Sequence, residues 1–238
     1  MKVSLQLYTL RGELEKDFIA TVKRVGELGY DGVEFAGFGG LSSDEMNLVL
    51  AESNLYSVGS HTGFGEFESS LEADLEYNKA IGSEYVVCPH FIFDSREDLD
   101  YLVKTLNDAS VKAEKYGLKI GYHNHIHEFE KIEGEYILDL IAKNTNDNVV
   151  LELDVFFVEN FGIDPVAYIE KWGKKIELIH LKQTTEDKKN VDLQDGVIDM
   201  AKIIDVAKYA RHFIVEQNGA DLSIFESVKR NVEFLKGL

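Results

Sequence analysis

Four strand-like segments in the second half of the chain each end in side chains that can bind a metal ion or transfer a proton. They are KIGYHNHIHEF at 119–129, VVLELD at 149–154, IELIHLK at 176–182 and FIVEQ at 213–217. If these strands lie parallel in one barrel, their carboxyl ends meet on a single rim, where such barrels place their active sites. The side chains that would converge there are His125 or Glu128, Asp154, His180 and Glu216. The pattern therefore predicts an enzyme.

A cation site is indicated by Asp154, His180 and Glu216. Two carboxylates and one imidazole form a mixed ligand set that suits Mn²⁺, Mg²⁺, Co²⁺ or Zn²⁺. The spacing between them corresponds to one strand-and-helix unit per ligand. The alternative is a network of paired rim charges without an ion, in which one histidine must neutralise two carboxylates. We expect one divalent metal ion.

The run from His123 to Glu128 offers further candidate ligands. On a strand, His123 and His125 share one face while Asn124 points to the other, so only one of these sets can face the barrel interior. Glu128 follows the strand and could fold back towards the metal. These residues extend the predicted site to the fifth strand.

The elements that must position these residues alternate regularly along the chain. Short β-branched or aromatic runs alternate with helical periodicity, which is typical of a parallel sheet built from repeated βα units. Eight strands are predicted at 3–8, 32–35, 56–61, 85–88, 119–123, 149–154, 176–181 and 213–216. Glycines at 29, 82 and 117 follow three of the helical segments as stop signals. No glycine-rich phosphate turn follows the first strand, so a closed (β/α)₈ barrel is favoured over an open dinucleotide-binding sheet.

Length and composition agree with one globular domain spanning 1–238, close to the roughly 250 residues of such a barrel. A formal net charge of −18 makes nucleic acid and anionic membranes unexpected partners. A single cysteine excludes an internal disulfide, and no signal peptide or membrane-spanning run is recognisable. We expect a cytoplasmic protein, with exposed helix faces that would permit a homo-oligomer.

The order and spacing of five segments resemble the xylose isomerase-like barrel superfamily, which contains sugar phosphate isomerases/epimerases, inosose dehydratases and endonuclease IV. These segments are GYDGVEF, YHNHIHEF, LELDVFF, IHLKQ and VEQNG. The resemblance covers nearly the whole chain. In this superfamily a divalent metal is held by Glu, Asp, His and Glu from strands five to eight.

The resemblance implies that Asp154, His180 and Glu216 are three of these ligands. The fourth is open between Glu128, His125 and His123, and Glu128 is favoured because it preserves the carboxylate. The chain departs from the family at HLKQ, where many relatives have HLKD, so Gln183 stands where those relatives have an acid.

The chemistry that the resemblance implies is proton abstraction next to a ketone or aldehyde, through an enediolate, in a sugar isomerase or epimerase. Glu216 is the candidate base and Glu128 would return the proton. The residues expected to contact the substrate are Glu34, His61, His90, His123, His125 and Lys182. Few glycines accompany Lys188 and Lys189 after the seventh strand, which favours an unphosphorylated sugar or cyclitol over a phosphorylated one.

Three alternatives share this barrel. An inosose dehydratase-type lyase would expel a β-hydroxyl from the same intermediate. An endonuclease IV-like nuclease would need a basic groove, which the net charge disfavours. A non-catalytic sugar-binding barrel would contain no metal.

Overall fold

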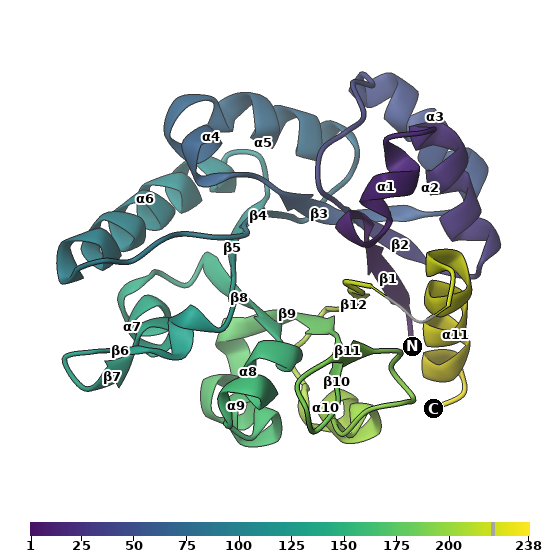
Figure 1. Ribbon diagram of the computed structural model, residues 1–238. Coiled ribbons are helices and arrows are strands. Elements are labelled where there is room, and N and C mark those ends of the chain that lie inside the picture. Colours follow the sequence, from purple (N-terminus) through teal and green to yellow (C-terminus); the bar gives the residue numbers. More distant parts are fainter. Residues whose placement is uncertain (220–221) are drawn as a thin grey trace.

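The computed structural model describes residues 1–219 and 222–238, and its centre is a closed barrel of eight parallel strands. Each strand pairs with the next one around the barrel, and the last closes against the first. The strands are β1 (Val3–Gln6), β2 (Gly32–Phe35), β3 (Tyr56–His61), β4 (Tyr85–Cys88), β5 (Lys119–His123), β8 (Val149–Asp154), β9 (Ile176–Leu181) and β12 (His212–Val215). The helices surround this ring (Figure 1). The molecule is therefore the predicted (β/α)₈ TIM barrel.

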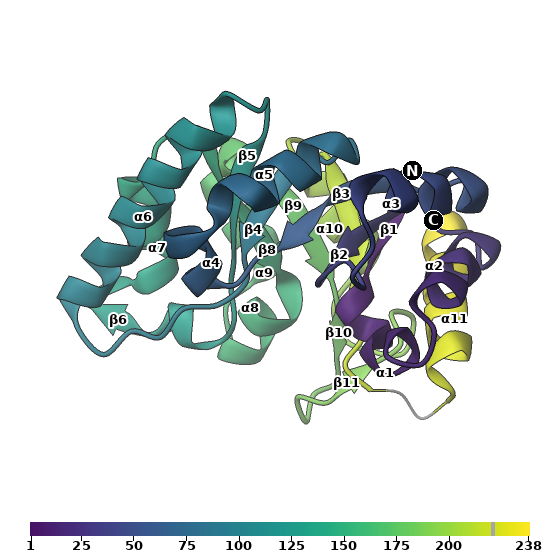
Figure 2. The same ribbon diagram turned by 90° about the horizontal axis from the view of Figure 1, so that it is seen from above.

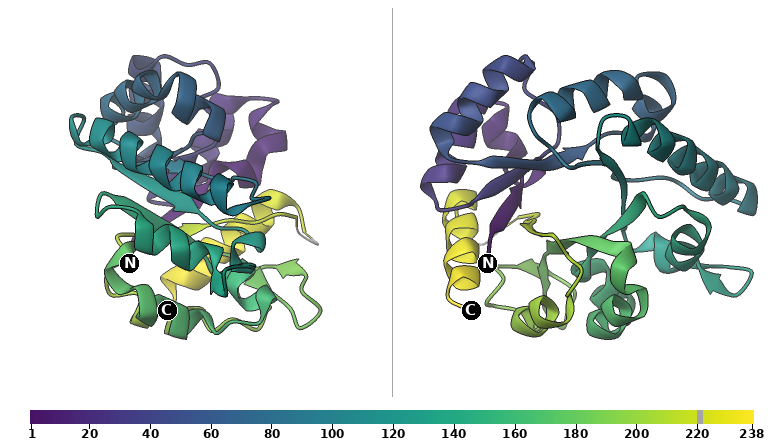
Figure 3. Two further views of the ribbon diagram at one scale, coloured as in Figure 1. Left: turned by 90° about the vertical axis from the view of Figure 1, so that its left-hand side faces the viewer. Right: turned by 180° about the vertical axis from the view of Figure 1, so that it is seen from behind.

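Helices connect consecutive strands on the outside of the barrel, and the view from behind shows the same outer layer (Figure 3). The α-helices are α1 (Arg11–Leu14), α2 (Phe18–Glu27), α3 (Ser43–Ser53), α4 (Phe64–Ser69), α5 (Leu71–Ala80), α6 (Arg96–Glu114), α7 (Ile137–Asn144), α8 (Val155–Phe161), α9 (Pro165–Trp172), α10 (Met200–Val206) and α11 (Ile224–Lys236). The predicted stop at Gly29 has a positive φ of 100° there, a conformation that glycine adopts at little cost. None of the described helices is both long and apolar enough to cross a membrane.

The first strand is shorter than predicted. It ends at Gln6 because the Gln6 side chain accepts a hydrogen bond from the Tyr8 amide at 2.9 Å and starts a 3₁₀ helix, η1 (Leu7–Leu10). Two further 3₁₀ turns are η2 (His127–Phe129) and η3 (Gly173–Lys175).

The sequence did not predict the two small hairpins. They are formed by β6 (Lys131–Ile132) with β7 (Glu135–Tyr136) and by β10 (Gln183–Thr184) with β11 (Asn190–Val191). Figure 2 shows β10 and β11 on the side of the barrel opposite the chain termini.

The core has two parts, because side chains of each strand alternate between the barrel interior and the helix layer. The larger part lies between the strands and the helices. A separate small cluster comes from strands β3, β4, β8, β9 and β12, and it comprises Val58, Tyr85, Val87, Val150, Leu178 and Ile214. These residues fill the barrel interior below its rim. The polar groups at the rim therefore lie above an apolar layer of side chains.

The reactivity of the Cys88 thiol is an experimental test of whether the barrel is closed. It is fully buried at the end of β4, and burial raises the pKa of its thiol to about 12. Only thiolate reacts with disulfide reagents, and an exposed cysteine has a pKa of about 8.5. We expect Cys88 to react at pH 8 about a thousandfold more slowly in the folded protein than in urea, measured by thiol titration. Equal rates would mean that the barrel opens readily at β4.

Candidate metal and active site

The carboxyl ends of the strands bring polar side chains from distant parts of the sequence into contact. Gln6 of β1 donates its side-chain amide to Glu34 Oε2 of β2 at 2.7 Å. His180 of β9 bridges two carboxylates, with Nε2 at 2.8 Å from Glu34 Oε2 and Nδ1 at 3.0 Å from Glu216 Oε2. This network joins both halves of the chain on the rim where the sequence places the site.

One set of four potential metal ligands comprises His123, Asp154, His180 and Glu216, which we call the outer group. One ligand atom from each residue lies within 4.8 Å of all the others, and all four residues are buried. Lys182 contacts two carboxylates of the outer group: its Nζ lies 3.4 Å from Glu216 Oε1 and 3.8 Å from Asp154 Oδ2. The three ligands that the sequence indicates are thus neighbours, and His123 stands in the fourth position.

The donor atoms of the outer group fit a divalent cation. Asp154 Oδ1 accepts a hydrogen bond from the Phe156 amide at 2.9 Å, which fixes the carboxylate, and the Asp154 amide donates to Asn124 Oδ1 at 3.0 Å. Asp154 Oδ2 and His123 Nδ1 are buried without a hydrogen-bond partner among the described residues. Buried polar atoms are nearly always satisfied, and a cation held by this group would satisfy Asp154 Oδ2.

Burial and neighbouring charges set the protonation of the outer group. Burial raises the pKa of Asp154 to about 7, although Lys182 opposes this rise. Burial also disfavours the charged form of Glu216, but the hydrogen bond from His180 and the charge of Lys182 outweigh it and hold the pKa of Glu216 well below its ordinary value. Burial lowers the pKa of His123 to about 4. His123 is therefore neutral at pH 7, as a metal ligand must be.

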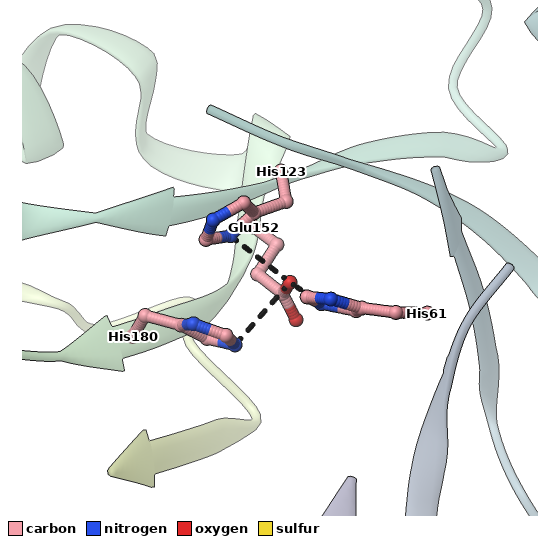
Figure 4. A group of neighbouring side chains, drawn as sticks. All are labelled: His61, His123, Glu152 and His180. Atoms are coloured by element: carbon pink, nitrogen blue, oxygen red, sulfur yellow. Dashed lines mark hydrogen bonds and ion pairs between the residues drawn. The ribbon is translucent and has the colours of Figure 1, made fainter. Parts of the chain in front are cut away.

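A second set of potential ligands lies on the opposite side of His180 and comprises His61, His123, Glu152 and His180, which we call the inner group. Figure 4 shows the three imidazoles surrounding one oxygen of Glu152. Sequence analysis missed Glu152. The available signal was a charged residue inside an otherwise apolar strand, two positions before Asp154 and therefore on the same face.

A cavity of about 450 Å³ opens above these groups. Five of the predicted site residues line it: His61, His90, His123, His125 and Glu216. Burial lowers the pKa of His125 to about 3, so this side chain is neutral at pH 7. Glu34 and Lys182 are 0% and 1% exposed and lie buried beside the two groups, where they contact potential ligands.

Glu128 does not join either group. Its carboxylate is fully buried and accepts hydrogen bonds from the Tyr122 hydroxyl at 2.7 Å and from the His125 amide at 2.8 Å. The 3₁₀ turn η2 begins at His127 and turns Glu128 towards β5. The structure therefore places His123, and not the favoured Glu128, beside Asp154, His180 and Glu216.

Comparison with known proteins agrees with this fold. Residues 22–238 match the family described as xylose isomerase-like TIM barrel. An inosose dehydratase of Clostridium beijerinckii is 25% identical over 161 residues, which cover 60% of this chain and 53% of that protein. The chain thus matches about half the length of this relative.

Solved structures share the fold over the whole chain. A sugar phosphate isomerase/epimerase from Parabacteroides distasonis superposes with a TM-score of 0.85 at 23% identity, covering 99% of this chain and 93% of that one. A structure described as the IOLI protein with a binding zinc atom has a TM-score of 0.77 at 18% identity, covering 100% of this chain and 97% of the other.

Proposed function

Because the chain belongs to the xylose isomerase-like TIM barrel family, we propose that it is a divalent-metal-dependent isomerase or epimerase of an uncharged sugar or related polyol. The observation that carries this proposal is that Glu216 belongs to the outer group and also lines the cavity. A carboxylate in this position can contact a substrate held beside the ion. The C. beijerinckii relative is named for an inosose, an uncharged cyclitol, which supports this substrate class.

The cation would be held by the outer group, namely His123, Asp154, His180 and Glu216. When bound, a divalent ion supplies Lewis-acid chemistry that makes the C–H bond next to a carbonyl more acidic. Two imidazoles and two carboxylates accept Mn²⁺, Co²⁺ or Zn²⁺. The unsatisfied atom Asp154 Oδ2 supports this assignment.

Glu216 is the proposed base. It is held ionised by His180 and Lys182, which is the form that accepts a proton. The buried Lys182 ammonium lies 3.4 Å from Glu216 Oε1 and orients the carboxylate. Glu128 does not line the cavity, so a second acid on the opposite face of the substrate is not supplied by that residue. One carboxylate that removes and returns the proton favours aldose–ketose isomerisation over epimerisation.

The remaining cavity walls suit a neutral substrate. His90 and His125 have lowered pKa values because of burial, so they offer neutral hydrogen-bonding groups to hydroxyls. The described residues that line the cavity include neither lysine nor arginine. A phosphate group would find no cationic partner among them.

The proposal is tested by proton exchange. Unphosphorylated ketoses and inososes are incubated with the protein and Mn²⁺ in deuterated water, and deuterium uptake is followed by NMR. We expect uptake at one carbon next to the carbonyl, and none after chelation with EDTA. Phosphorylated ketoses should exchange at least about tenfold more slowly, a difference of about 1.4 kcal/mol.

Three outcomes are informative. Absence of exchange with every substrate class would contradict proton abstraction. A preference for the phosphorylated sugar would overturn only the assignment of a neutral substrate. Loss of water from an inosose, seen as a mass decrease, would instead identify the dehydratase that the C. beijerinckii relative suggests.

A further inference from the structure

The inner group has the geometry of a metal site of its own. Glu152 Oε2 lies 2.7 Å from His61 Nε2, 3.3 Å from His123 Nδ1 and 3.3 Å from His180 Nε2. Tetrahedral zinc with bonds of about 2.0–2.2 Å separates its ligand atoms by about 3.3–3.5 Å. Two of these three Glu152–imidazole distances already match, and the shortest would have to lengthen.

The ligands of the inner group come from four different strands, β3, β5, β8 and β9, and converge in a nearly dry part of the barrel. The side chain of His61 is 12% exposed, and those of Glu152 and His180 are 0% exposed. Glu152 Oε1 has no hydrogen-bond partner among the described residues. A fully buried carboxylate oxygen that lacks a donor is rare in proteins and is satisfied when a cation binds.

The charges around the inner group also favour a cation. Glu34 Oε2 lies 2.8 Å from His180 Nε2 and 3.4 Å from His61 Nε2, so a second buried carboxylate adjoins the ligands. An imidazole must be neutral to bind a metal, so a divalent ion would take the place of the protons on the histidines that face these two carboxylates. Two buried carboxylates this close are costly without a compensating charge.

We propose that His61, His123, Glu152 and His180 form a second metal site, below the outer group and selective for zinc. Three imidazoles and one carboxylate are a donor set typical of Zn²⁺, whereas the two carboxylates of the outer group are better suited to Mn²⁺. Glu152 and His61 belong only to the inner group, and Asp154 and Glu216 belong only to the outer group.

His123 and His180 belong to both groups, which couples the two sites. His180 directs Nε2 to the inner group and Nδ1 to Glu216 of the outer group. An ion in the inner group draws His123 away from the outer group. Zn²⁺ in the inner site therefore weakens Mn²⁺ binding in the outer site.

The test compares Glu152→Gln with Asp154→Asn, a matched pair of carboxylate-to-amide changes on the same face of β8. Zn²⁺ and Mn²⁺ binding are measured by calorimetry on the whole protein, and Zn²⁺ is titrated into the Mn²⁺-loaded form. Loss of an outer-shell partner alone costs about 10- to 100-fold in metal affinity, so loss of a direct ligand should cost at least about tenfold. Glu152→Gln should weaken Zn²⁺ by this factor and change Mn²⁺ by less than about threefold. Asp154→Asn should weaken Mn²⁺ binding by at least about tenfold and change Zn²⁺ binding by less than about threefold.

Competition gives a readout that a purely structural role of Glu152 would not change. In the native protein Zn²⁺ should weaken Mn²⁺ binding through the inner site as well as by direct displacement at the outer group, and in Glu152→Gln only the direct displacement should remain. His61→Asn should reproduce the Glu152→Gln result, and it carries the test if the buried Gln variant fails to fold. Unchanged Zn²⁺ affinity in the folded inner-group variants, or equal losses of both metals, would overturn the proposal. Because these measurements read metal binding, they decide it whether or not the proposed reaction is found.

Discussion

Replacement of Glu216 by Gln is expected to lower deuterium exchange into the substrate by about a thousandfold while the fold is retained. The amide has the same shape as the carboxylate but cannot accept a proton from carbon. Glu216 is 6% exposed and lines the cavity, so the change acts at the point where the substrate would bind. The measurement is the exchange rate at saturating Mn²⁺, with metal content determined in parallel.

The exposed Glu130 provides a control, because Glu130→Gln makes the same chemical change away from the cavity lining. This variant should exchange at the native rate. If Glu216→Gln binds a full complement of Mn²⁺ and still exchanges within about threefold of the native rate, Glu216 is not the base. If both activity and metal are lost, activity regained at higher Mn²⁺ would assign the carboxylate to metal binding alone.

Replacement of Lys182 by Met is expected to destabilise the metal-free protein by about 3–5 kcal/mol. Lys182 is 1% exposed, and its ammonium lies between the carboxylates of Asp154 and Glu216. Methionine keeps an apolar side chain of similar length but removes the ammonium, whose Nζ lies 5.1 Å and 5.0 Å from the ring centroids of Phe156 and Phe157. The variant therefore removes the charge and leaves two buried carboxylates close together without a cation.

A bound ion should restore much of this stability, since it supplies the missing positive charge and binds only the folded state. Urea unfolding is measured in EDTA and in Mn²⁺, with the exposed Lys208→Met as the control. We expect Mn²⁺ to stabilise Lys182→Met more than it stabilises the native protein. Native-like stability of Lys182→Met in EDTA would show that the ammonium does not compensate the two carboxylates.

The sequence predicted the elements well because their signals are local. Alternation of β-branched runs with helical periodicity identified all eight strands, with small shifts such as the early end of β1 at Gln6. The capping hydrogen bond that ends this strand depends on a side-chain conformation, which periodicity does not reveal. Asp154, His180 and Glu216 were recognisable because ionisable residues at the ends of buried strands need partners.

Strand register determines which side chains meet inside the barrel. A register shift between Leu151 and Glu152 changes how β8 pairs with β9, and Glu152 lies opposite Leu178 in the paired strands. Its carboxylate then meets imidazoles of other strands. No local pattern in β8 specifies which residues of β3, β5 and β9 will stand opposite that position, so the inner group could not be predicted.

What the sequence determined by itself was a parallel barrel with an aspartate, a histidine and a glutamate on one rim, because strand direction and side-chain alternation follow from the backbone. Only the tertiary structure shows that His123, rather than His125 or Glu128, lies beside these three residues. The turn η2 commits Glu128 to the Tyr122 hydroxyl, while the pleat of β5 directs His123 into the barrel. That choice depends on packing between segments and on the hydrogen bonds each side chain finds there, which arise only when the chain is folded.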